Sequence, residues 1–560
     1  MDAPAFTTAG RGGGPVPYAA LAKANRARVV AQLRSLAGAA VLDDPASPTL
    51  LYLKGMPSST RPGTDTENVI RQESHFYYMT GVEAPDYHFL YDLQQDTATL
   101  VMPTFPADYA LWSGPVPTPE QVRVRYGVDH VVHVDGIAAL PCLRDAATKP
   151  PCVLTLDPSV RLDHLIPGDR SYYVAPRGSP EASLLQRAIV RCRIVKSDGE
   201  LELLREAARI SAAAHVAVMR AVRPGQGDEG MLQALFEYEC SRRGARFQAY
   251  SPIIAGGRNG SFLHYVRNDQ PVPSDGAQML LVDAACEYGM YACDITRTFP
   301  VGGTFTGDYR LVYAMTLAVQ EQLIPLLRPG LYWEDFHREA MRLVVAQLLE
   351  HGLLQGGSVE ELMALDLGAV FFPHGIGHPI GVDVHDVFLS TAEAASESAR
   401  TSANTSVDSA ASMTSVAAAR DRGACPGNDP PPLLASASMP PAPPSAPVPP
   451  PASNTLGAWR LQNRKPRFRH QLQPGMVVTV EPGIYFVDLL LDNAMRDESL
   501  KPFINIDLVQ RLRANVGGVR IEDCIIITES GYEVITGDVP KTIADIEALM
   551  ASPSRCPRGA

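Results

Sequence analysis

Two apolar, strand-like runs in the second half of the chain end at an acidic residue. Asp283 follows the run from Met279 to Val282, and Glu481 follows the run from Val477 to Val480. We expect strands this apolar to be buried, where an unpaired carboxylate is costly. The fold must therefore supply each of these acidic residues with a partner.

A second aspartate, Asp294, follows Asp283 by eleven residues. The sequence Glu287-Tyr288-Gly289 between them is typical of a turn, and a hairpin would bring the two carboxylates side by side. Either residue alone would be interpreted as a surface Asp. Two carboxylates that converge from apolar strands repel each other at low dielectric, and a multivalent cation would offset that repulsion.

Three of the 13 histidines fall within 12 residues of one another, in a glycine-rich segment that contains His374, His378 and His385. The glycines at 375, 377 and 381 allow the backbone to bend and to approach other groups closely. A lone His would more often be a core residue. Three with this glycine pattern favour a ligand or acid–base site.

The segment Val519 to Asp523 alternates, so we expect Arg520 and Glu522 to share one face of a strand that continues to Thr528. The alternative, a surface ion pair, is weakened by the apolar run that follows. Four carboxylates and one imidazole thus become candidate ligands: Asp283, Asp294, His378, Glu481 and Glu522. This set suits a divalent ion such as manganese better than structural zinc or copper. Four negative charges would balance two such ions, which can stabilise a hydrolytic transition state.

Composition favours a soluble, cytoplasmic protein. Hydrophobic residues make up 46% of the 560 residues, and the net charge of −12 argues against nucleic acid or an anionic membrane as a partner. Nine scattered cysteines without a C-x-x-C pair indicate a reducing compartment. No run is long enough to span a membrane, and residues 1–17, which lack the apolar run of a signal peptide, are expected to be flexible.

The chain divides into three regions. Residues 18–190 mix short strands, such as 50–53 and 98–102, with turns, which predicts an α/β layer domain. Residues 191–387 and 459–550 form the second region, in which Ser197 and Glu200 predict a capping box before a helix with one apolar face. Residues 388–458 are rich in Ala, Ser and Pro and predict a disordered insertion, partly polyproline II. A ligand for SH3 or WW modules is the alternative for this insertion.

The combined pattern resembles the pita-bread metallopeptidases, and most closely their prolidase group. The resemblance rests on six motifs: Arg71-Gln72-Glu73-Ser74, Leu263-His264-Tyr265, the Asp283 and Asp294 pair, and the segments 374–386, 479–485 and 517–523. It implies an α/β (α+β) protein with a creatinase-like, aminopeptidase-P-like N-terminal domain. It also implies a pita-bread catalytic domain with a curved antiparallel sheet.

The resemblance further implies a centre of two divalent ions, with manganese the expected metal. Asp283 would bind one ion and His378 and Glu481 the other, while Asp294 and Glu522 would bridge both. Glu481 would also take or relay the proton of the attacking water. His264 and His385 would contact the substrate, and His374 would lie behind the ligands.

The implied activity is hydrolysis of Xaa-Pro bonds, in dipeptides or short peptides. A dipeptidase needs a cation for the carboxylate on the product side, and Arg467 falls where the family has such an arginine. The alternative is that Arg467 belongs to a solvated basic run. Arg520 and Tyr250 match other positions that contact the substrate.

Two other functions remain open. Within the family, aminopeptidase P removes the first residue from longer peptides. A metal-free pseudoenzyme that binds peptides or histones is the other class, and retention of all five metal positions argues against it. The resemblance also implies a homodimer, in which a loop near Trp112 covers the neighbouring site; a core position for Trp112 is the alternative.

Overall fold

The structure is a computed structural model that describes residues 18–38, 42, 48–140, 143, 151–156, 173–174, 184–389 and 471–552. The predictions of a flexible segment at 1–17 and of a role for Arg467 lie outside the described residues. So does the predicted insertion at 388–458, apart from its first two residues. Among the described helices, none is long and apolar enough to cross a membrane.

The N-terminal part is built on one mixed sheet. Its order within the described residues is β4-β3-β2-β1-β5-β6, with antiparallel pairing in the centre and parallel pairing towards both edges. Apolar side chains of this sheet, among them Leu50, Tyr52 and Val101, form a fully buried core. The strands are β1 (Thr49–Lys54), β2 (His88–Asp92), β3 (Thr97–Met102), β4 (His130–His133), β5 (Cys152–Thr155) and β6 (Tyr173–Val174).

Helices accompany this sheet. Helix α1 packs against α7 and α3, so the first and the last helix of the N-terminal part lie side by side. The helices are α1 (Tyr18–Ala37), α3 (Ser74–Thr80), α4 (Tyr109–Ser113), α5 (Pro119–Tyr126), the 3-10 helix η1 (Val134–Ala139) and α7 (Leu184–Ile194). The expected domain boundary after residue 190 falls inside α7.

The C-terminal part contains short sheets whose described strands all pair antiparallel, in the orders β11-β10-β7, β12-β9-β8, β13-β16-β17 and β14-β15. A bridge between Thr296 and Glu522 joins two of these sheets. The strands are β7 (Phe247–Gln248), β8 (Ile253–Gly256), β9 (Met279–Asp283), β10 (Cys286–Tyr288), β11 (Tyr291–Ala292), β12 (Thr296–Pro300), β13 (Val477–Val480), β14 (Gly483–Tyr485), β15 (Gly518–Arg520), β16 (Asp523–Ile527) and β17 (Tyr532–Val534).

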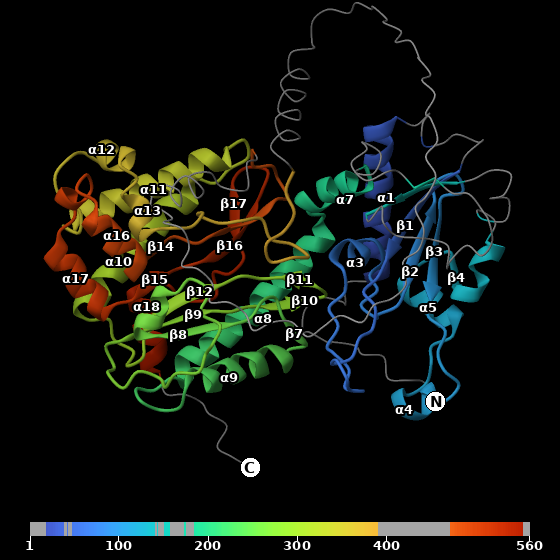
Figure 1. Ribbon diagram of the computed structural model, residues 1–560, viewed down its shortest axis with the longest axis horizontal. Helices are drawn as coiled ribbons and strands as arrows, with labels where there is room; N and C mark the ends of the chain where they lie inside the picture. Colours follow the sequence, from blue (N-terminus) through green and yellow to red (C-terminus); the bar gives the residue numbers. More distant parts are fainter. Residues whose placement is uncertain are drawn as a thin grey trace, which may run out of the picture. The chain divides into compact units, whose positions relative to one another are not determined.

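Helices cover these strands on two sides (Figure 1): α8 and α9 pack against β8, β10 and β11, whereas α10 and α13 pack against β14 and β15. The described helices are α8 (Asp198–Ala221), α9 (Glu229–Ser241), α10 (Gly307–Leu323), α11 (Trp333–Glu350), α12 (Val359–Ala364), α13 (Gly368–Phe371), α16 (Asp488–Arg496), α17 (Ile506–Asn515) and α18 (Ile543–Ala551). Short 3-10 helices are η2 (Gly257–Ser261), η3 (Ile324–Leu326) and η4 (Lys501–Phe503).

Most local predictions are confirmed. The predicted strands at 50–53 and 98–102 lie in β1 and β3, and those at 279–282 and 476–480 correspond to β9 and β13. The capping box of Ser197 and Glu200 begins α8. The predicted fold class, an α/β N-terminal domain followed by an antiparallel catalytic domain, is confirmed as well.

Three local predictions need correction. The run from Val519 to Thr528 is not one strand, because pairing stops between Arg520 and Asp523. Glu287 and Tyr288 belong to β10, and the turn lies at Gly289 and Met290, which both have positive φ as a two-residue hairpin turn requires. Trp112 is 77% exposed on α4, so the alternative of a core position is wrong.

A buried ion cluster holds the histidine-rich segment in place. The guanidinium of Arg193 donates to Asp386 and to Asp383, at 2.6 Å in each case, and Lys196 donates to Asp386 at 2.9 Å. The side chains of Arg193, Lys196 and Asp386 are each 1% exposed. Burial raises the pKa of Asp386, but the charges of Lys196 and Arg193 outweigh burial and hold that pKa below its ordinary value.

We expect the Asp386→Asn substitution to lower the free energy of unfolding at pH 7 by about 3 kcal/mol, because two buried cations lose their shared carboxylate. The folded-state pKa of Asp386 lies below its unfolded value of about 4, so its contribution is present above about pH 4 and is lost as the pH falls through the folded pKa. The difference between wild type and variant should therefore shrink in acid. Equilibrium urea unfolding over a series of pH values measures it.

The Asp269→Asn variant is a matched control, since Asp269 pairs with Arg267 on the exposed surface. It should change the free energy of unfolding far less than Asp386→Asn does, because solvent screens an exposed ion pair. Equal losses in the two variants would contradict a structural role for the buried cluster.

Candidate metal centre

Asp283 and Asp294 converge because the strands beside them pair antiparallel. The register of β9 with β12 places Asp283 opposite Thr296, two residues after Asp294. The hydroxyl oxygen of Tyr250 lies 2.6 Å from Oδ1 of each Asp. One hydroxyl has a single hydrogen and can donate it to only one carboxylate at a time. The predicted convergence is confirmed, and it leaves one of the two carboxylate oxygens without a donor.

Glu481 and Glu522 face each other at a gap in strand pairing. Glu481 follows β13 and Glu522 precedes β16, and the registers on both sides of the gap place the two residues opposite each other. Oε2 of Glu522 accepts a hydrogen bond from the Thr296 hydroxyl at 2.7 Å. Oε1 of Glu522 is buried and has no hydrogen-bond partner. Two carboxylates directly opposite each other destabilise a strand pair unless something compensates them.

His378 presents a ring nitrogen to these carboxylates. Its Nδ1 lies 3.0 Å from the carbonyl oxygen of Pro379, and because a carbonyl only accepts, Nδ1 carries the hydrogen in the neutral ring. Nε2 then offers a lone pair, 3.4 Å from Oδ2 of Asp294 and 3.7 Å from Oε1 of Glu481. When both carboxylates are ionised, these facing lone pairs have no hydrogen to share, and a metal ion satisfies that arrangement.

The carboxylates also disfavour one another's ionised form. Burial and the charge of Asp283 raise the pKa of Asp294 to about 8. Burial and Glu522 raise the pKa of Glu481 well above its ordinary value, and burial and Asp294 do the same for the pKa of Glu522. Ionisation of Asp294, Glu481 and Glu522 together therefore requires positive charge close to them.

The side chains present fit a divalent metal ion. Ligand atoms of Asp294, His378 and Glu522 all lie within 4.8 Å of one another. The lone pair of His378 and the unpartnered Oε1 of Glu522 are the atoms that such an ion would bind. Carboxylates with one imidazole suit a hard or borderline ion such as manganese.

Arg520 lies among the candidate ligands and is 4% exposed. It donates to Oδ2 of Asp283 at 2.5 Å, to the Thr296 hydroxyl at 3.0 Å and to the Tyr485 hydroxyl at 2.9 Å. Each of its three nitrogen atoms thus bonds a protein group, and the bond to Asp283 pairs the guanidinium with one carboxylate of the acidic cluster. The predicted contact of Arg520 with substrate stays a prediction.

Of the other predicted site histidines, His374 is half-buried, whereas His385 and His264 are exposed. Nδ1 of His374 donates to the carbonyl oxygen of Gly375, so Nε2 accepts from the Tyr485 hydroxyl at 2.8 Å; burial and the charge of Arg520 lower the pKa of His374 to about 3. His374 is therefore neutral at pH 7. His385 is exposed, with its ring centre 4.1 Å from that of His378. His264 is exposed and close enough to His374 to contribute to its lowered pKa.

Two side chains at the site were absent from the sequence prediction. Thr296 bonds both Glu522 and Arg520. It follows Asp294 by two residues, and that spacing could have indicated that the two side chains lie on the same face of an extended segment. Tyr485 joins His374 to Arg520, and no local pattern distinguishes it from a core tyrosine. Of the predicted substrate contacts, Tyr250 bonds the candidate ligand Asp283 through its hydroxyl. Arg467 is outside the described residues.

Comparisons with known proteins match both parts of the chain. Metallopeptidase family M24 matches residues 202–407 and 453–529, and the N-terminal domain of aminopeptidase P matches residues 22–146. The chain is 34% identical over 511 residues to the Xaa-Pro dipeptidase of Homo sapiens, which covers 90% of this chain and 89% of that protein. It is 33% identical over 535 residues to a Pyricularia oryzae protein named "Probable Xaa-Pro aminopeptidase PEPP", with 95% and 97% covered.

Solved structures share the fold. Aminopeptidase PepP of Pseudomonas aeruginosa has a TM-score of 0.66 and 27% identity, and the likeness covers 94% of this chain and 98% of that one. Aminopeptidase P from E. coli with the inhibitor Pro-Leu has a TM-score of 0.63 and 25% identity, over 94% and 98% of the two chains. Both likenesses extend over the N-terminal and the catalytic parts.

We expect the Gly377→Ala substitution to weaken Mn²⁺ binding at least about tenfold, because the backbone beside His378 would be displaced. A Cβ at position 377 would overlap the backbone carbonyl group of Thr479, which cannot move without disturbing β13. Isothermal titration of chelator-treated protein with Mn²⁺ measures the dissociation constant.

The Gly531→Ala variant serves as the control, since a Cβ at position 531 meets no atom within 4 Å. It should bind Mn²⁺ as the wild type does. Wild-type affinity in a folded Gly377→Ala protein would mean that His378 does not take part in metal binding.

Proposed function

The chain belongs to metallopeptidase family M24, and from that membership we propose that it hydrolyses Xaa-Pro bonds, with dipeptides as its main substrates. The observation that carries this proposal is the convergence of four carboxylates and one imidazole, among which Nε2 of His378 faces Asp294 and Glu481 and Oε1 of Glu522 has no hydrogen-bond partner. A buried cluster of this charge is unfavourable as a structural element and favourable as a metal site. The named relatives support the choice of substrate.

We propose two manganese ions as the cofactor, held by Asp283, Asp294, His378, Glu481 and Glu522. The count of four negative side chains is the argument for two divalent ions, and the oxygen-rich donor set is the argument for manganese. When bound, the ions polarise the scissile carbonyl and make a water molecule more acidic.

The chain's own residues handle the proton and the substrate. Glu481 takes the proton of the attacking water as the new C–O bond forms. It then passes that proton to the prolyl nitrogen as the C–N bond breaks. The exposed His264 and His385 contact the substrate, and the neutral His374 lies behind Glu481, with Nδ1 3.7 Å from Oε2.

The carboxylate of a dipeptide substrate requires a cation. We assign this role to Arg467, with Arg520 as a second arginine beside the ligands and Tyr250 as part of the site wall. A bidentate guanidinium–carboxylate contact would select a free carboxyl group directly after proline.

We also propose that the protein is a cytoplasmic homodimer. The exposed side chains of Leu111 and Trp112 on α4 support an interface there, because neighbouring large apolar side chains on a surface commonly mark a contact with a partner. Five described cysteines, Cys192, Cys240, Cys286, Cys293 and Cys524, are buried free thiols, which agrees with a reducing compartment.

A second candidate activity is removal of the first residue from longer peptides. It is favoured by the relative named as an Xaa-Pro aminopeptidase and by the likeness to solved aminopeptidases P. The metal-free pseudoenzyme remains disfavoured, because such a protein has no need to keep five ligand positions.

We expect purified protein to cleave Gly-Pro faster than Gly-Pro-Xaa, and to need added Mn²⁺ after treatment with a chelator. The physical reason is that the proposed arginine contact recognises a carboxylate only where proline is the last residue. Release of free proline or glycine, measured for both peptides with and without Mn²⁺, tests this. Faster cleavage of the tripeptide would favour the aminopeptidase activity, and no cleavage at any metal concentration would contradict both.

The Arg467→Ala variant separates the two substrate preferences further. It should reduce kcat/KM for the dipeptide by about tenfold to a hundredfold while changing that for the tripeptide little, because a charged hydrogen bond contributes about 1.5–3 kcal/mol. An equal loss for both peptides would remove Arg467 from its proposed role.

A further inference from the structure

The two glutamates of the metal centre lie at a gap in one antiparallel ladder. In the gap, Ile521 donates its backbone N–H to the carbonyl oxygen of Pro482, at 3.3 Å. A regular antiparallel pair would return a second hydrogen bond, from residue 482 to residue 521. Pro482 has no N–H, so the carbonyl of Ile521 loses its ladder partner directly before Glu522.

The side chain of Gln320 supplies the missing donor. Gln320 lies on α10, is fully buried, and its Nε2 lies 3.1 Å from the carbonyl oxygen of Ile521 and 3.1 Å from that of Val480. The amide therefore gives one hydrogen to each strand. The two carbonyls belong to the residues that immediately precede Glu522 and Glu481, so one side chain connects the two ligand-bearing turns of the backbone.

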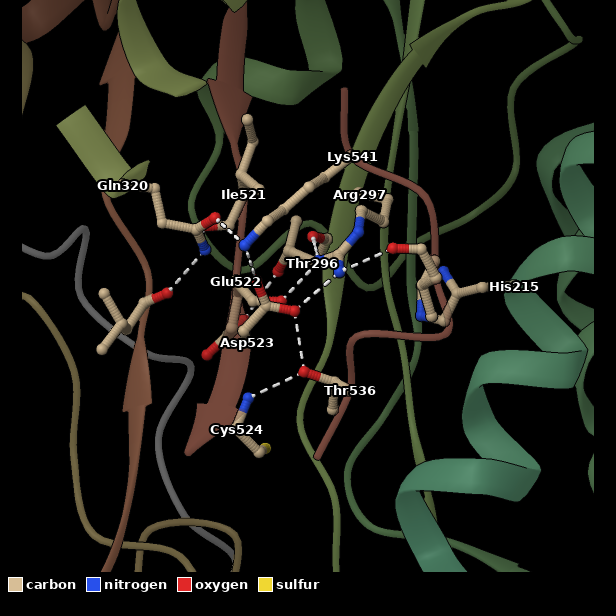
Figure 2. A network of polar contacts seen from close by, with 12 residues as sticks. His215, Thr296, Arg297, Gln320, Ile521, Glu522, Asp523, Cys524, Thr536 and Lys541 are labelled. Atoms are coloured by element: carbon tan, nitrogen blue, oxygen red, sulfur yellow. Dashed lines mark hydrogen bonds and ion pairs between the residues drawn. The ribbon is translucent and has the colours of Figure 1, made fainter. Parts of the chain in front are cut away.

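A charged network fixes the orientation of this amide. Oε1 of Gln320 accepts from Lys541 at 2.9 Å, and Lys541 also donates to Oδ2 of Asp523 at 2.7 Å. Figure 2 shows Gln320 and Lys541 on one side of Asp523 and Arg297 on the other. Because an ammonium only donates, Oε1 must face Lys541 and the NH₂ group must face the strands.

Arg297, in the same network, bonds the backbone of Glu522 directly. Arg297 donates to the backbone carbonyl of Glu522 at 2.6 Å, to that of Thr296 at 2.9 Å, and to Oδ1 of Asp523 at 2.6 Å. The Arg297 and Asp523 side chains are completely buried. The backbone of Glu522 is thus fixed both before and after its Cα atom, by Gln320 and by Arg297.

We propose that Gln320 is a positioning residue of the metal centre, which sets the separation of Glu481 and Glu522 by bonding the backbone directly before each. This inference rests on the proposed metal-dependent function. Mutual repulsion pushes the two carboxylates apart, and the shared amide opposes that movement through the backbone. Loss of the amide lets the strands separate at the gap, so the glutamates bind a shared metal less tightly.

Two substitutions remove the bonds in different ways. Gln320→Met keeps the volume and removes all polar contacts, whereas Gln320→Glu keeps a partner for Lys541 and removes the donors to both strands. Gln322→Met is the matched control, because Gln322 lies on the same helix and its exposed amide bonds only the helix's own backbone, at Ala318. We expect both Gln320 variants to raise the dissociation constant for Mn²⁺ about tenfold or more, as loss of a group that orients ligands does.

The measurements are isothermal titration with Mn²⁺ and the melting temperature with and without Mn²⁺. A positioning role reduces the rise in melting temperature that metal produces, since this rise follows the affinity for the folded state. A purely structural role would lower the melting temperature of the metal-free protein while leaving the Mn²⁺ dissociation constant unchanged, and that result would overturn the proposal. Equal weakening in the Gln322→Met control would also overturn it.

The wild type separates this inference from the proposed function. If the wild type binds no Mn²⁺, the proposed function fails and the inference fails with it. If the wild type binds Mn²⁺ and the Gln320 variants bind it equally tightly, the inference alone fails. Should neither Gln320 variant fold, Lys541→Met decides, because it frees the amide to rotate and its side chain lies at the edge of the cluster, 23% exposed. Wild-type Mn²⁺ affinity in Lys541→Met would then overturn the proposal.

Discussion

Repulsion among buried carboxylates is the constraint on which the rest of this structure depends. Asp283, Asp294, Glu481 and Glu522 come from strand ends far apart in the sequence, and burial raises the pKa of the last three. Four carboxylates this close repel one another, and many of the surrounding hydrogen bonds keep them from moving apart. Arg520 neutralises one side of it through Asp283, and the free lone pairs on the other side are suited to divalent ions.

The fold holds these ligands through backbone contacts rather than through side chains alone. The segment that carries His378 and His385 is fixed by the Arg193–Asp386–Lys196 cluster and by pairing with β13. The segments that carry Glu481 and Glu522 are fixed by Gln320 and Arg297. Rigid backbone on both sides means that the ligands are held in place before any metal arrives, which favours a defined coordination geometry.

The acidic side chains and the histidine of the cluster could be predicted from the sequence because their signals are local. An apolar strand that ends in a carboxylate is visible within six residues, and the glycine-rich segment marks His378 in the same way. The prediction of one continuous strand after Val519 was wrong because Pro482, which lies opposite Ile521 and 39 residues before it, has no N–H to continue the pairing. Gln320 could not be found, since a glutamine inside an amphipathic helix has no local feature that identifies its distant partners.

The central claim is that the five ligand side chains surround two divalent ions. Crystals of the protein grown with Mn²⁺ and measured at the manganese absorption edge test it most directly. Two anomalous peaks are expected about 3.5–4 Å apart, each within about 2.5 Å of oxygen or nitrogen atoms from this set of side chains. An absence of anomalous density among these carboxylates in manganese-containing crystals would contradict it.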